Sequence, residues 1–480
     1  MGKELTSLYS VKQLSDGIKD RSISSVDLIE VCLQRIKKFN PSLDAFITVL
    51  EEFSYKDAEI ADRQIKQGLD LGPLHGIPFS IKDMFYAKGV RCTAGSRIMV
   101  DYISEMDATS VSKMKQAGAI LIGTNNLNEF ASGITGINPY YGNSKNPWNT
   151  SKISGGSSGG SAVAVATGMA PISLATDTGG SIRVPSSLCG VVGLKPTYGR
   201  ISRNGVMALA PSLDHVGCIV RSAWDAAAVL ECISGQEFVG PISRCKKKSS
   251  YTELVEDSTV EKISVGIPKQ YFFDYLQTEV EHVFYNFIDT IKSMGIPICE
   301  DISLHYAEKY SKSWREVRLA EAAEIHLEWL KTRPKEYGED VRRMLIQGTE
   351  VPAVNYIKAV NNTEEIRNEF LKILNKVDVI IIPTTILTAP GFDESTNATS
   401  TTTISGKVLE VREALLRNNI VFNSTGLPAV TIPAGLSRSH MPVGVQIVGS
   451  PFEEDKILSI AYNYERINDS LTKFIPPICQ

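Results

Sequence analysis

The sequence is poor in histidine and lacks any arrangement of residues that is typical of a metal site. Only six of its 480 residues are histidine, and its eight cysteines are scattered, without a C-x-x-C pair or a histidine at metal-ligand spacing. A structural zinc site and a disulfide framework are therefore both disfavoured. We expect reduced thiols in a cytoplasmic protein that holds no metal.

Long apolar runs and an excess of positive charge are missing as well. No run of eighteen apolar residues occurs, and the first residues do not show the positive-then-apolar pattern of a signal peptide. The formal net charge is −4, so the chain has no overall positive field that would hold tRNA or DNA. We expect a protein that spans no membrane and, as a single chain, does not bind nucleic acid directly.

Residues 73–235 show the alternation that is typical of an α/β core. Short apolar segments alternate with glycine-rich turns and helical stretches, and further apolar segments follow later in the chain. These segments predict strands at residues 77–81, 119–122, 172–175, 216–220, 263–265, 377–382, 429–432 and 443–448.

Two other regions are predominantly helical. In residues 1–72, Ser25 is expected to cap a helix, and a second helix is expected over residues 55–67. Residues 302–376 are helical and charged, and they predict a lid-like excursion. Because apolar segments return after it, we expect the C-terminal part to rejoin the same sheet in one domain over residues 1–480.

The densest cluster of glycine and serine is SGGSSGGS at residues 154–161, directly before a small apolar helix. A flexible linker does not usually run into a tightly packable helix, and the loop lacks the Gly-Lys-Ser/Thr ending of a Walker loop. It does satisfy the G-x-S-x-G pattern of an α/β-hydrolase elbow around Ser157. That alternative stays open and needs a catalytic histidine, for which the candidates are His282, His305, His326 and His440.

A second cluster, TDTGGSIR at residues 176–183, follows a predicted strand. A strand that ends in a Gly-Gly-Ser turn exposes several backbone N–H groups beside a hydroxyl, which is what acyl transfer requires. Lys82 ends another predicted strand, and a lysine becomes a useful base only when burial or neighbouring charge destabilises its ammonium. Neither feature decides the function alone, but their combination predicts a serine hydrolase.

Together these blocks resemble the amidase signature family, in spacing as well as in motif. Ser157 follows Lys82 by 75 residues, and Ser181 follows Ser157 by 24. The resemblance is nearly continuous over residues 73–221 and extends more weakly to the GLPA and PVGVQ blocks near the C-terminus. It implies an α/β fold with a single large mixed β-sheet of about eleven strands, covered by helices on both faces.

The resemblance also implies a reaction. Ser181 matches the acylating nucleophile, Ser157 matches a bridging serine whose peptide bond is typically cis, and Lys82 matches the general base, with no cofactor. Neutral Lys82 would take a proton from Ser157 while Ser157 takes one from Ser181, and the amide would be cleaved through an acyl-enzyme. Because all three positions are intact, a scaffold without activity is disfavoured.

Further positions around the nucleophile carry implied supporting roles. Asp83, Asp177 and Ser158 are expected to shape the site rather than to react, and a substrate contact by Arg183 is left open. The positions implied to hold the tetrahedral oxyanion or to border the substrate carbonyl are Ala131, Thr178, Gly179, Gly180 and Ser181.

Two kinds of family member share this signature region: stand-alone amidases and the A subunit of the tRNA-dependent glutamyl/aspartyl amidotransferase, which hydrolyses glutamine. The A subunit usually has an aspartate that holds the glutamine amino group shortly before the N-x-x-G-L-P block, and Leu416 occupies that position here. A leucine cannot pair with an ammonium, although Glu413 lies one helical turn away. We therefore favour a stand-alone amidase with a small-molecule amide substrate, and a homodimer stays open. The alternative is the A subunit with amidotransferase B and C subunits as partners.

Overall fold

The computed structural model describes residues 8–235, 250–395, 400–469 and 473–480. Its strands are β1 (Phe46–Val49), β2 (Pro78–Lys82), β3 (Ile120–Asn125), β4 (Ile172–Asp177), β5 (Val192–Lys195), β6 (His215–Val220), β7 (Val265–Gly266), β8 (Ile298–Cys299), β9 (Val379–Pro383), β10 (Thr401–Ile404), β11 (Lys407–Glu410), β12 (Ala429–Leu436) and β13 (Pro442–Gly449). Within these ranges eleven strands form one sheet in the order β1-β3-β2-β4-β6-β5-β12-β13-β9-β7-β8, and β10 pairs with β11 separately. The expected single large mixed sheet is therefore confirmed.

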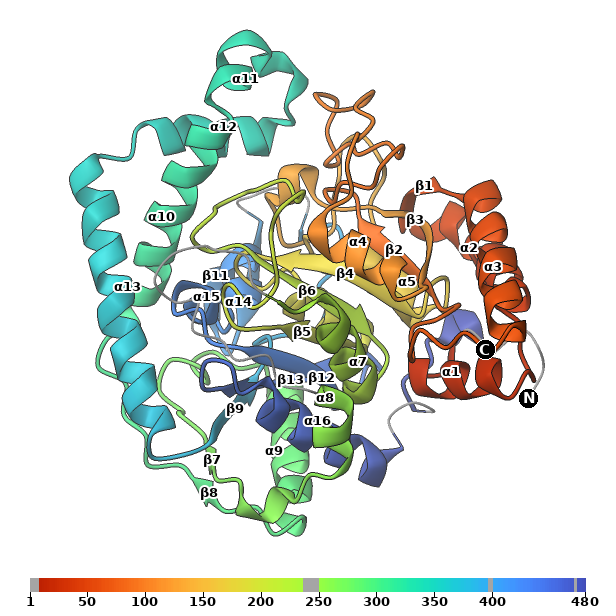
Figure 1. Ribbon diagram of the computed structural model, residues 1–480. Helices are drawn as coiled ribbons and strands as arrows, with labels where there is room; N and C mark the ends of the chain where they lie inside the picture. The colour runs from red at the N-terminus through yellow and green to blue at the C-terminus, as the bar shows by residue number, and fades with distance from the viewer. Residues whose placement is uncertain (1–7, 236–249, 396–399, 470–472) are drawn as a thin grey trace.

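Helices pack around this sheet on both of its faces (Figure 1). In the described ranges the α-helices are α1 (Val11–Lys19), α2 (Ser25–Leu43), α3 (Glu51–Lys66), α4 (Thr109–Gln116), α5 (Gly159–Ala166), α6 (Arg183–Cys189), α7 (Ala223–Ile233), α8 (Tyr251–Glu256), α9 (Thr278–Ser293), α10 (Tyr310–Ile325), α11 (Leu327–Thr332), α12 (Glu339–Thr349), α13 (Ala353–Leu374), α14 (Val411–Leu416), α15 (Ile420–Ser424) and α16 (Glu454–Asn468). In Figure 1, α1 to α3 lie at one side of the molecule, and α10 to α13 stand along the opposite side.

Most of the predicted elements are present. Each of the eight predicted strands overlaps an observed strand, whereas the short strands β1, β5, β8, β10 and β11 were not anticipated. The expected cap of α2 is wrong by one residue, because Ser24 accepts the hydrogen bond from the Asp27 N–H and the Asp27 carboxylate accepts one from Ser24. After α13, β9 pairs with β13 and β7, so the chain does rejoin the same sheet.

One edge of the sheet gathers the residues that the sequence singled out. Strand β2 lies between β3 and β4 and runs parallel to both. The carboxyl ends of parallel strands meet at the same edge of a sheet. Lys82 and Asp177 are the last residues of β2 and β4, so the fold brings the lysine and the second serine loop together.

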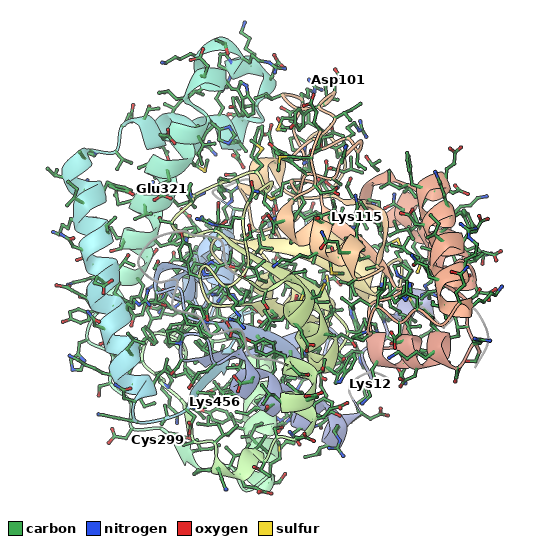
Figure 2. All side chains as sticks on the ribbon, in the orientation of Figure 1. Lys12, Asp101, Lys115, Cys299, Glu321 and Lys456 are labelled. Carbon is green, nitrogen blue, oxygen red and sulfur yellow. The ribbon has the colours of Figure 1, made fainter. Side chains whose placement is uncertain are left out.

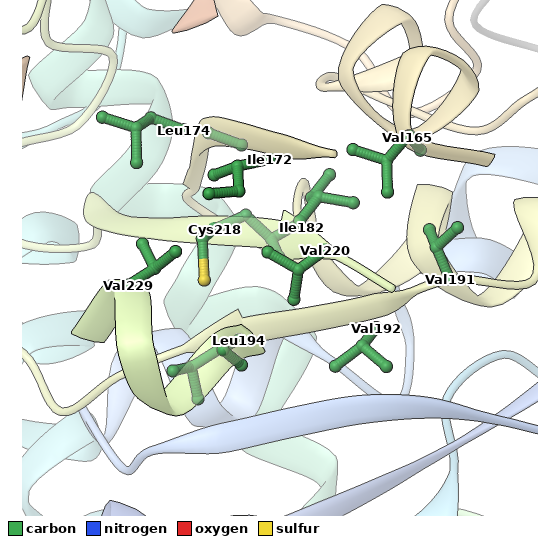
Figure 3. Close-up of a cluster of buried hydrophobic side chains, with 14 of the residues drawn as sticks. Val165, Ile172, Leu174, Ile182, Val191, Val192, Leu194, Cys218, Val220 and Val229 are labelled. Carbon is green, nitrogen blue, oxygen red and sulfur yellow. The ribbon is translucent and has the colours of Figure 1, made fainter. Parts of the chain in front are cut away.

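The core beneath this edge consists of small and branched side chains (Figure 3). Helix α5 is buried along its whole length, which explains why it is made of glycine, alanine, serine and valine. A Cβ atom at Gly160 would lie 2.4 Å from the Ala45 carbonyl oxygen. The side chains labelled in Figure 3 are buried and belong to Val165, Ile172, Leu174, Ile182, Val191, Val192, Leu194, Cys218, Val220 and Val229.

Several charged side chains labelled in Figure 2, such as Lys12, Lys115 and Lys456, are partly exposed at the surface. Two of them pair there with carboxylates, Lys115 with Asp107 at 2.7 Å and Lys456 with Asp378 at 3.0 Å. Among the described residues, no helix combines the length and the apolar character that crossing a membrane requires.

Candidate active site

Lys82 is a buried amine held by two hydroxyl groups. Its side chain is 0% exposed, and its Nζ donates to Ser157 Oγ at 2.7 Å and to Thr176 Oγ1 at 2.9 Å. Burial lowers the pKa of Lys82 to about 7, and the carboxylates of Asp177 and Asp214 partly oppose this effect. A substantial fraction of this amine is therefore neutral at physiological pH, as a general base requires.

Ser157 lies in a loop that packs tightly against its neighbours. The Gly156–Ser157 peptide bond is cis, as the resemblance implied, and the Ser157 carbonyl accepts a hydrogen bond from the Asn128 N–H at 3.3 Å. A Cβ atom at Gly156 would lie 2.2 Å from Asn128 Oδ1, so no larger residue fits there. The Ser158 N–H donates to the Ser181 carbonyl at 3.3 Å, which joins the two serine loops.

The carboxylate of Asp177 organises the second serine loop. It accepts hydrogen bonds from the N–H groups of Gly180 at 2.7 Å and Ile182 at 3.1 Å. The Gly180 N–H therefore points to Asp177, unlike the implied oxyanion role. The N–H groups of Gly179 and Ser181 have no hydrogen-bond partner among the described residues, so both are free to bind a ligand.

Arg183 is buried beneath the loop and fully engaged by the protein. Its guanidinium donates to Asp177 at 3.0 Å, to Asn423 Oδ1 at 2.6 Å, to Gln446 Oε1 at 3.0 Å and to the Asn419 carbonyl at 3.1 Å. Burial alone would raise the pKa of Asp177, but the Arg183 charge holds it well below its usual range. Arg183 is 0% exposed and lines neither of the two cavities described below.

Asp83 and Ser158 are buried and form hydrogen bonds with neighbouring segments. Asp83 Oδ2 accepts hydrogen bonds from the N–H and hydroxyl groups of Thr93, and burial raises the pKa of Asp83 to about 7. Ser158 Oγ donates to the Thr176 carbonyl at 3.2 Å. Both side chains fix loops around Lys82 rather than facing open space.

Ala131 is held in place by an unusual turn. It has φ 56° and follows Phe130 at φ 48°, in the left-handed region that favours glycine. The Phe130 ring packs against His326, Trp329 and Tyr337, at ring-centroid distances of 4.4, 5.9 and 5.6 Å. This aromatic packing stabilises the turn that brings Ala131 to the cavity beside Ser181.

Ser181 lines a small cavity of about 50 Å³. This cavity adjoins a larger vestibule of about 470 Å³, because four residues line both spaces: Trp314, Arg318, Arg412 and Leu416. The other residues that line the small cavity are Ala131, Ser132, Gly133, Ile134, Thr178, Gly179, Ser181 and Leu209. The structure thus gathers Ser181 with the predicted Ala131, Thr178 and Gly179.

The histidine that an α/β-hydrolase mechanism needs is not found at this cavity. None of the described residues that line it is a histidine. His326 is buried in the aromatic cluster around Phe130, and its ring nitrogen Nδ1 lies 3.0 Å from the Tyr337 hydroxyl. The geometry therefore supports a lysine base rather than a histidine base.

Several residues of the site were not predicted from the sequence. Thr176, the second partner of Lys82, stands in the quoted TDTGGSIR cluster, but only strand pairing shows that its hydroxyl meets the lysine. Trp314 and Arg318 are four residues apart on α10, and this spacing places them on one face of the helix. Nothing in the sequence indicates that this face meets the serine loop. The Trp314 Nε1 donates to the Thr178 carbonyl at 2.9 Å.

Comparison with known proteins places this geometry among amide-cleaving enzymes. The Amidase family profile matches residues 27–458. The chain is 37% identical over 486 aligned positions to the A subunit of glutamyl-tRNA(Gln) amidotransferase from Geotalea daltonii, and the match covers 96% of this chain and 97% of that protein.

Solved structures agree in fold. A crystal structure of an amidase superposes with a TM-score of 0.85 at 32% identity, covering 96% of this chain and 100% of that one. The A subunit of glutamyl-tRNA(Gln) amidotransferase from Thermotoga maritima superposes with a TM-score of 0.76 at 33% identity, covering 92% of this chain and 91% of that one.

Proposed function

This chain belongs to the amidase family, and from that membership we propose that it hydrolyses a carboxamide C–N bond through an acyl-enzyme on Ser181. The observation that carries the proposal is the buried Lys82 amine, with a pKa of about 7, at 2.7 Å from Ser157 Oγ. A buried lysine that is hydrogen-bonded to hydroxyls, without an ion pair among the described residues, is costly to the fold. A base for proton transfer to and from serine explains why it is there.

The proposed reaction begins with a proton relay. Neutral Lys82 accepts the Ser157 hydroxyl proton, Ser157 accepts the Ser181 proton, and Ser181 Oγ forms a bond to the carbonyl carbon. The tetrahedral intermediate then collapses, the C–N bond breaks, and the relay returns the proton to the departing amine or ammonia. Water attacks the acyl-enzyme by the same route and releases the acid.

The negative charge of the tetrahedral intermediate needs donors that the fold has left free. The N–H groups of Gly179 and Ser181 meet this requirement, and they belong to the loop that the Asp177 carboxylate fixes. Donors that are already oriented stabilise the transition state without reorganisation. Thr178 and Ala131 line the same cavity and border the carbonyl in this arrangement.

The names of the curated relatives bear on the physiological role. They are A subunits of glutamyl-tRNA(Gln) amidotransferase at 35 to 37% identity, which gives the A-subunit role more support than the stand-alone amidase that we favoured from the sequence. We therefore propose, as the first role, glutamine hydrolysis in the cytoplasm together with amidotransferase B and C subunits.

One specific observation keeps a stand-alone amidase as the second candidate. Leu416, at the position expected to be acidic in the A subunit, lines the cavity beside Ser181. No carboxylate belongs to the described residues that line this cavity. Glu413 lines the outer vestibule and is not among the described residues that line this cavity.

Labelling with a fluorophosphonate tests the nucleophile. We expect the wild-type protein to be labelled on one serine, and Ser181→Ala to lose both the label and hydrolysis, with kcat lower by at least about 10⁴-fold. Ser132→Ala is the matched control, because Ser132 lines the same cavity and should leave the label in place. Stoichiometric labelling of Ser181→Ala would place the nucleophile elsewhere and contradict the proposal.

Ammonia release separates the two roles. Glutamine hydrolysis that appears or rises steeply on addition of B and C subunits and tRNA supports the amidotransferase role. Rapid turnover of simple amides by the purified chain, without any response to those partners, supports a stand-alone amidase and contradicts the first role.

A further inference from the structure

The vestibule outside the Ser181 cavity is rich in arginine. Five arginines line it, against three carboxylates. Asp340 is already engaged by Arg343 at 2.5 Å and Arg412 at 3.1 Å, and Arg417 pairs with Asp274 at 2.9 Å. The described part of this space therefore has an excess of positive charge, which favours an anionic ligand.

Arg318 differs from these paired arginines because the described residues give it no carboxylate. It stacks over the Trp314 ring at 4.9 Å, and its Nη1 lies 2.9 Å from the sulfur of Met344. Its Nε is shielded from solvent without a hydrogen-bond partner. Burial, together with the neighbouring cations Arg412 and Arg315, lowers the pKa of Arg318 to about 10.

Arg318, which carries this uncompensated charge, lines the same cavity as Ser181. Arg318 and Arg412 both line that cavity as well as the vestibule. A guanidinium presents a planar fork of N–H donors that matches a carboxylate, and the pair is stronger where water is excluded. A ligand that carries a carboxylate would supply the ion-pair partner that the described residues do not give Arg318.

We propose that Arg318 binds a carboxylate on the acyl portion of the substrate, so that the preferred substrates are monoamides of short dicarboxylic acids. This inference rests on the proposed amide hydrolysis at Ser181 and adds the substrate class. It holds for either physiological role, since glutamine also carries a carboxylate. The rival explanation is that Arg318 only packs on Trp314.

A panel of four related amides tests the substrate class. Glutaramate has a carboxylate, 4-aminobutanamide has an ammonium, glutamine has both, and butyramide has neither. We expect kcat/KM for glutaramate and glutamine to exceed that for 4-aminobutanamide and butyramide by about 30-fold or more, as for a partly buried charge pair. Equal or higher values for the two amides without a carboxylate would overturn the inference.

Variants of Arg318 separate binding from packing. Arg318→Met, of similar length and apolar, should lower the glutaramate-to-butyramide ratio of kcat/KM by about 30-fold, and Arg318→Lys should restore part of it. A purely structural role would change both substrates together and leave the ratio constant. Lys312→Met is the matched control, since Lys312 is exposed on the same helix, lines neither the vestibule nor the Ser181 cavity, and should keep the wild-type ratio.

Protection from fluorophosphonate labelling gives a readout that needs no turnover. Glutarate at millimolar concentration should slow the labelling of Ser181 in the wild-type protein and have little effect in Arg318→Met. Equal protection of both proteins, or none of either, would overturn the inference even if no amide of the panel is hydrolysed. Loss of labelling at Ser181 altogether would instead overturn the proposed nucleophile, so the two failures are distinguishable.

Discussion

Two arginines near Ser181 show opposite ways of placing a positive charge inside this fold. Arg183, beneath the nucleophile loop, meets a carboxylate, two side-chain amides and a backbone carbonyl, all from the protein. Arg318, on the vestibule side, has an aromatic ring, a thioether and other cations around it. The first charge is compensated within the chain, and the second is not.

This difference indicates that one arginine stabilises the fold and that the other is available to bind a ligand. A buried ion pair with further hydrogen bonds holds backbone groups in one arrangement, and here it fixes the loop that presents Ser181. A charge without a partner lowers stability, so its presence at a cavity points to a ligand that completes it. We call these two regions the floor, around Asp177 and Arg183, and the vestibule, around Arg318.

The largest expected effect is on the floor. Arg183→Met leaves the Asp177 carboxylate buried without its cation, and we expect the free energy of unfolding to fall by about 3–5 kcal/mol. The loop that presents Ser181 should also lose its order, so the folded fraction should no longer hydrolyse amides. Urea denaturation followed by circular dichroism measures the first effect.

Arg318→Met is the matched variant in the vestibule. Because it removes a charge that has no protein carboxylate, it should change the free energy of unfolding by less than about 1 kcal/mol or raise it. Equal destabilisation by the two substitutions would break the comparison and show that both arginines are structural.

Like Arg318, Lys82 is a cationic group without an ion-pair partner among the described residues, but Lys82 can lose its proton. Its pKa is about 7 in the folded protein and near 10.5 in the unfolded chain, so between these values the unfolded chain binds more protons. Stability of the wild-type protein should therefore rise with pH across this window. Lys82→Met should be more stable at pH 7, and its advantage should shrink by about 3 kcal/mol towards pH 10.

The control for this titration is again Arg318→Met, compared only up to about pH 9, because the pKa of Arg318, about 10, keeps its guanidinium largely protonated over that range. Its stability difference from wild type should change little between about pH 7 and pH 9. In parallel, kcat/KM of the wild-type protein for a neutral amide should rise as pH increases through about 7, because the neutral amine is the active form. A parallel stability curve for Lys82→Met and wild type would contradict a depressed pKa.

Most residues of the floor could be predicted from the sequence, whereas those of the vestibule could not. Lys82, Ser157 and Ser181 stand in glycine-rich or strand-ending segments whose local pattern already indicates strained turns and exposed N–H groups. The N-x-x-G-L-P and PVGVQ blocks stood out as motifs, but what their polar side chains do is visible only in the structure. There, Asn423 and Gln446 hold Arg183 from across the sheet.

The vestibule residues come from helices whose sequence pattern fits an ordinary solvated surface. Trp314 and Arg318 share a face of α10, but charged helices usually turn arginines to solvent, and periodicity cannot tell which face meets a loop 136 residues earlier in the chain. The sequence also could not predict that the Gly180 N–H is unavailable to a ligand, because only the structure shows that it donates to Asp177. Tertiary packing, rather than local propensity, decides both points.

The smallest effect that we predict comes from a substitution that would make the vestibule resemble the floor. Leu416 lines both the cavity and the vestibule, so Leu416→Asp would place a carboxylate where Arg318 has none. We expect kcat/KM for glutaramate to fall, because the new carboxylate competes for the guanidinium. Glutamine should suffer less, because its ammonium gains a partner, and its ratio to glutaramate should rise about tenfold, as for one charge pair of about 1.4 kcal/mol. Leu416→Asn, of equal size without the charge, should leave the ratio unchanged, and an equal rise in both variants would mean that polarity, not compensation of Arg318, sets the preference.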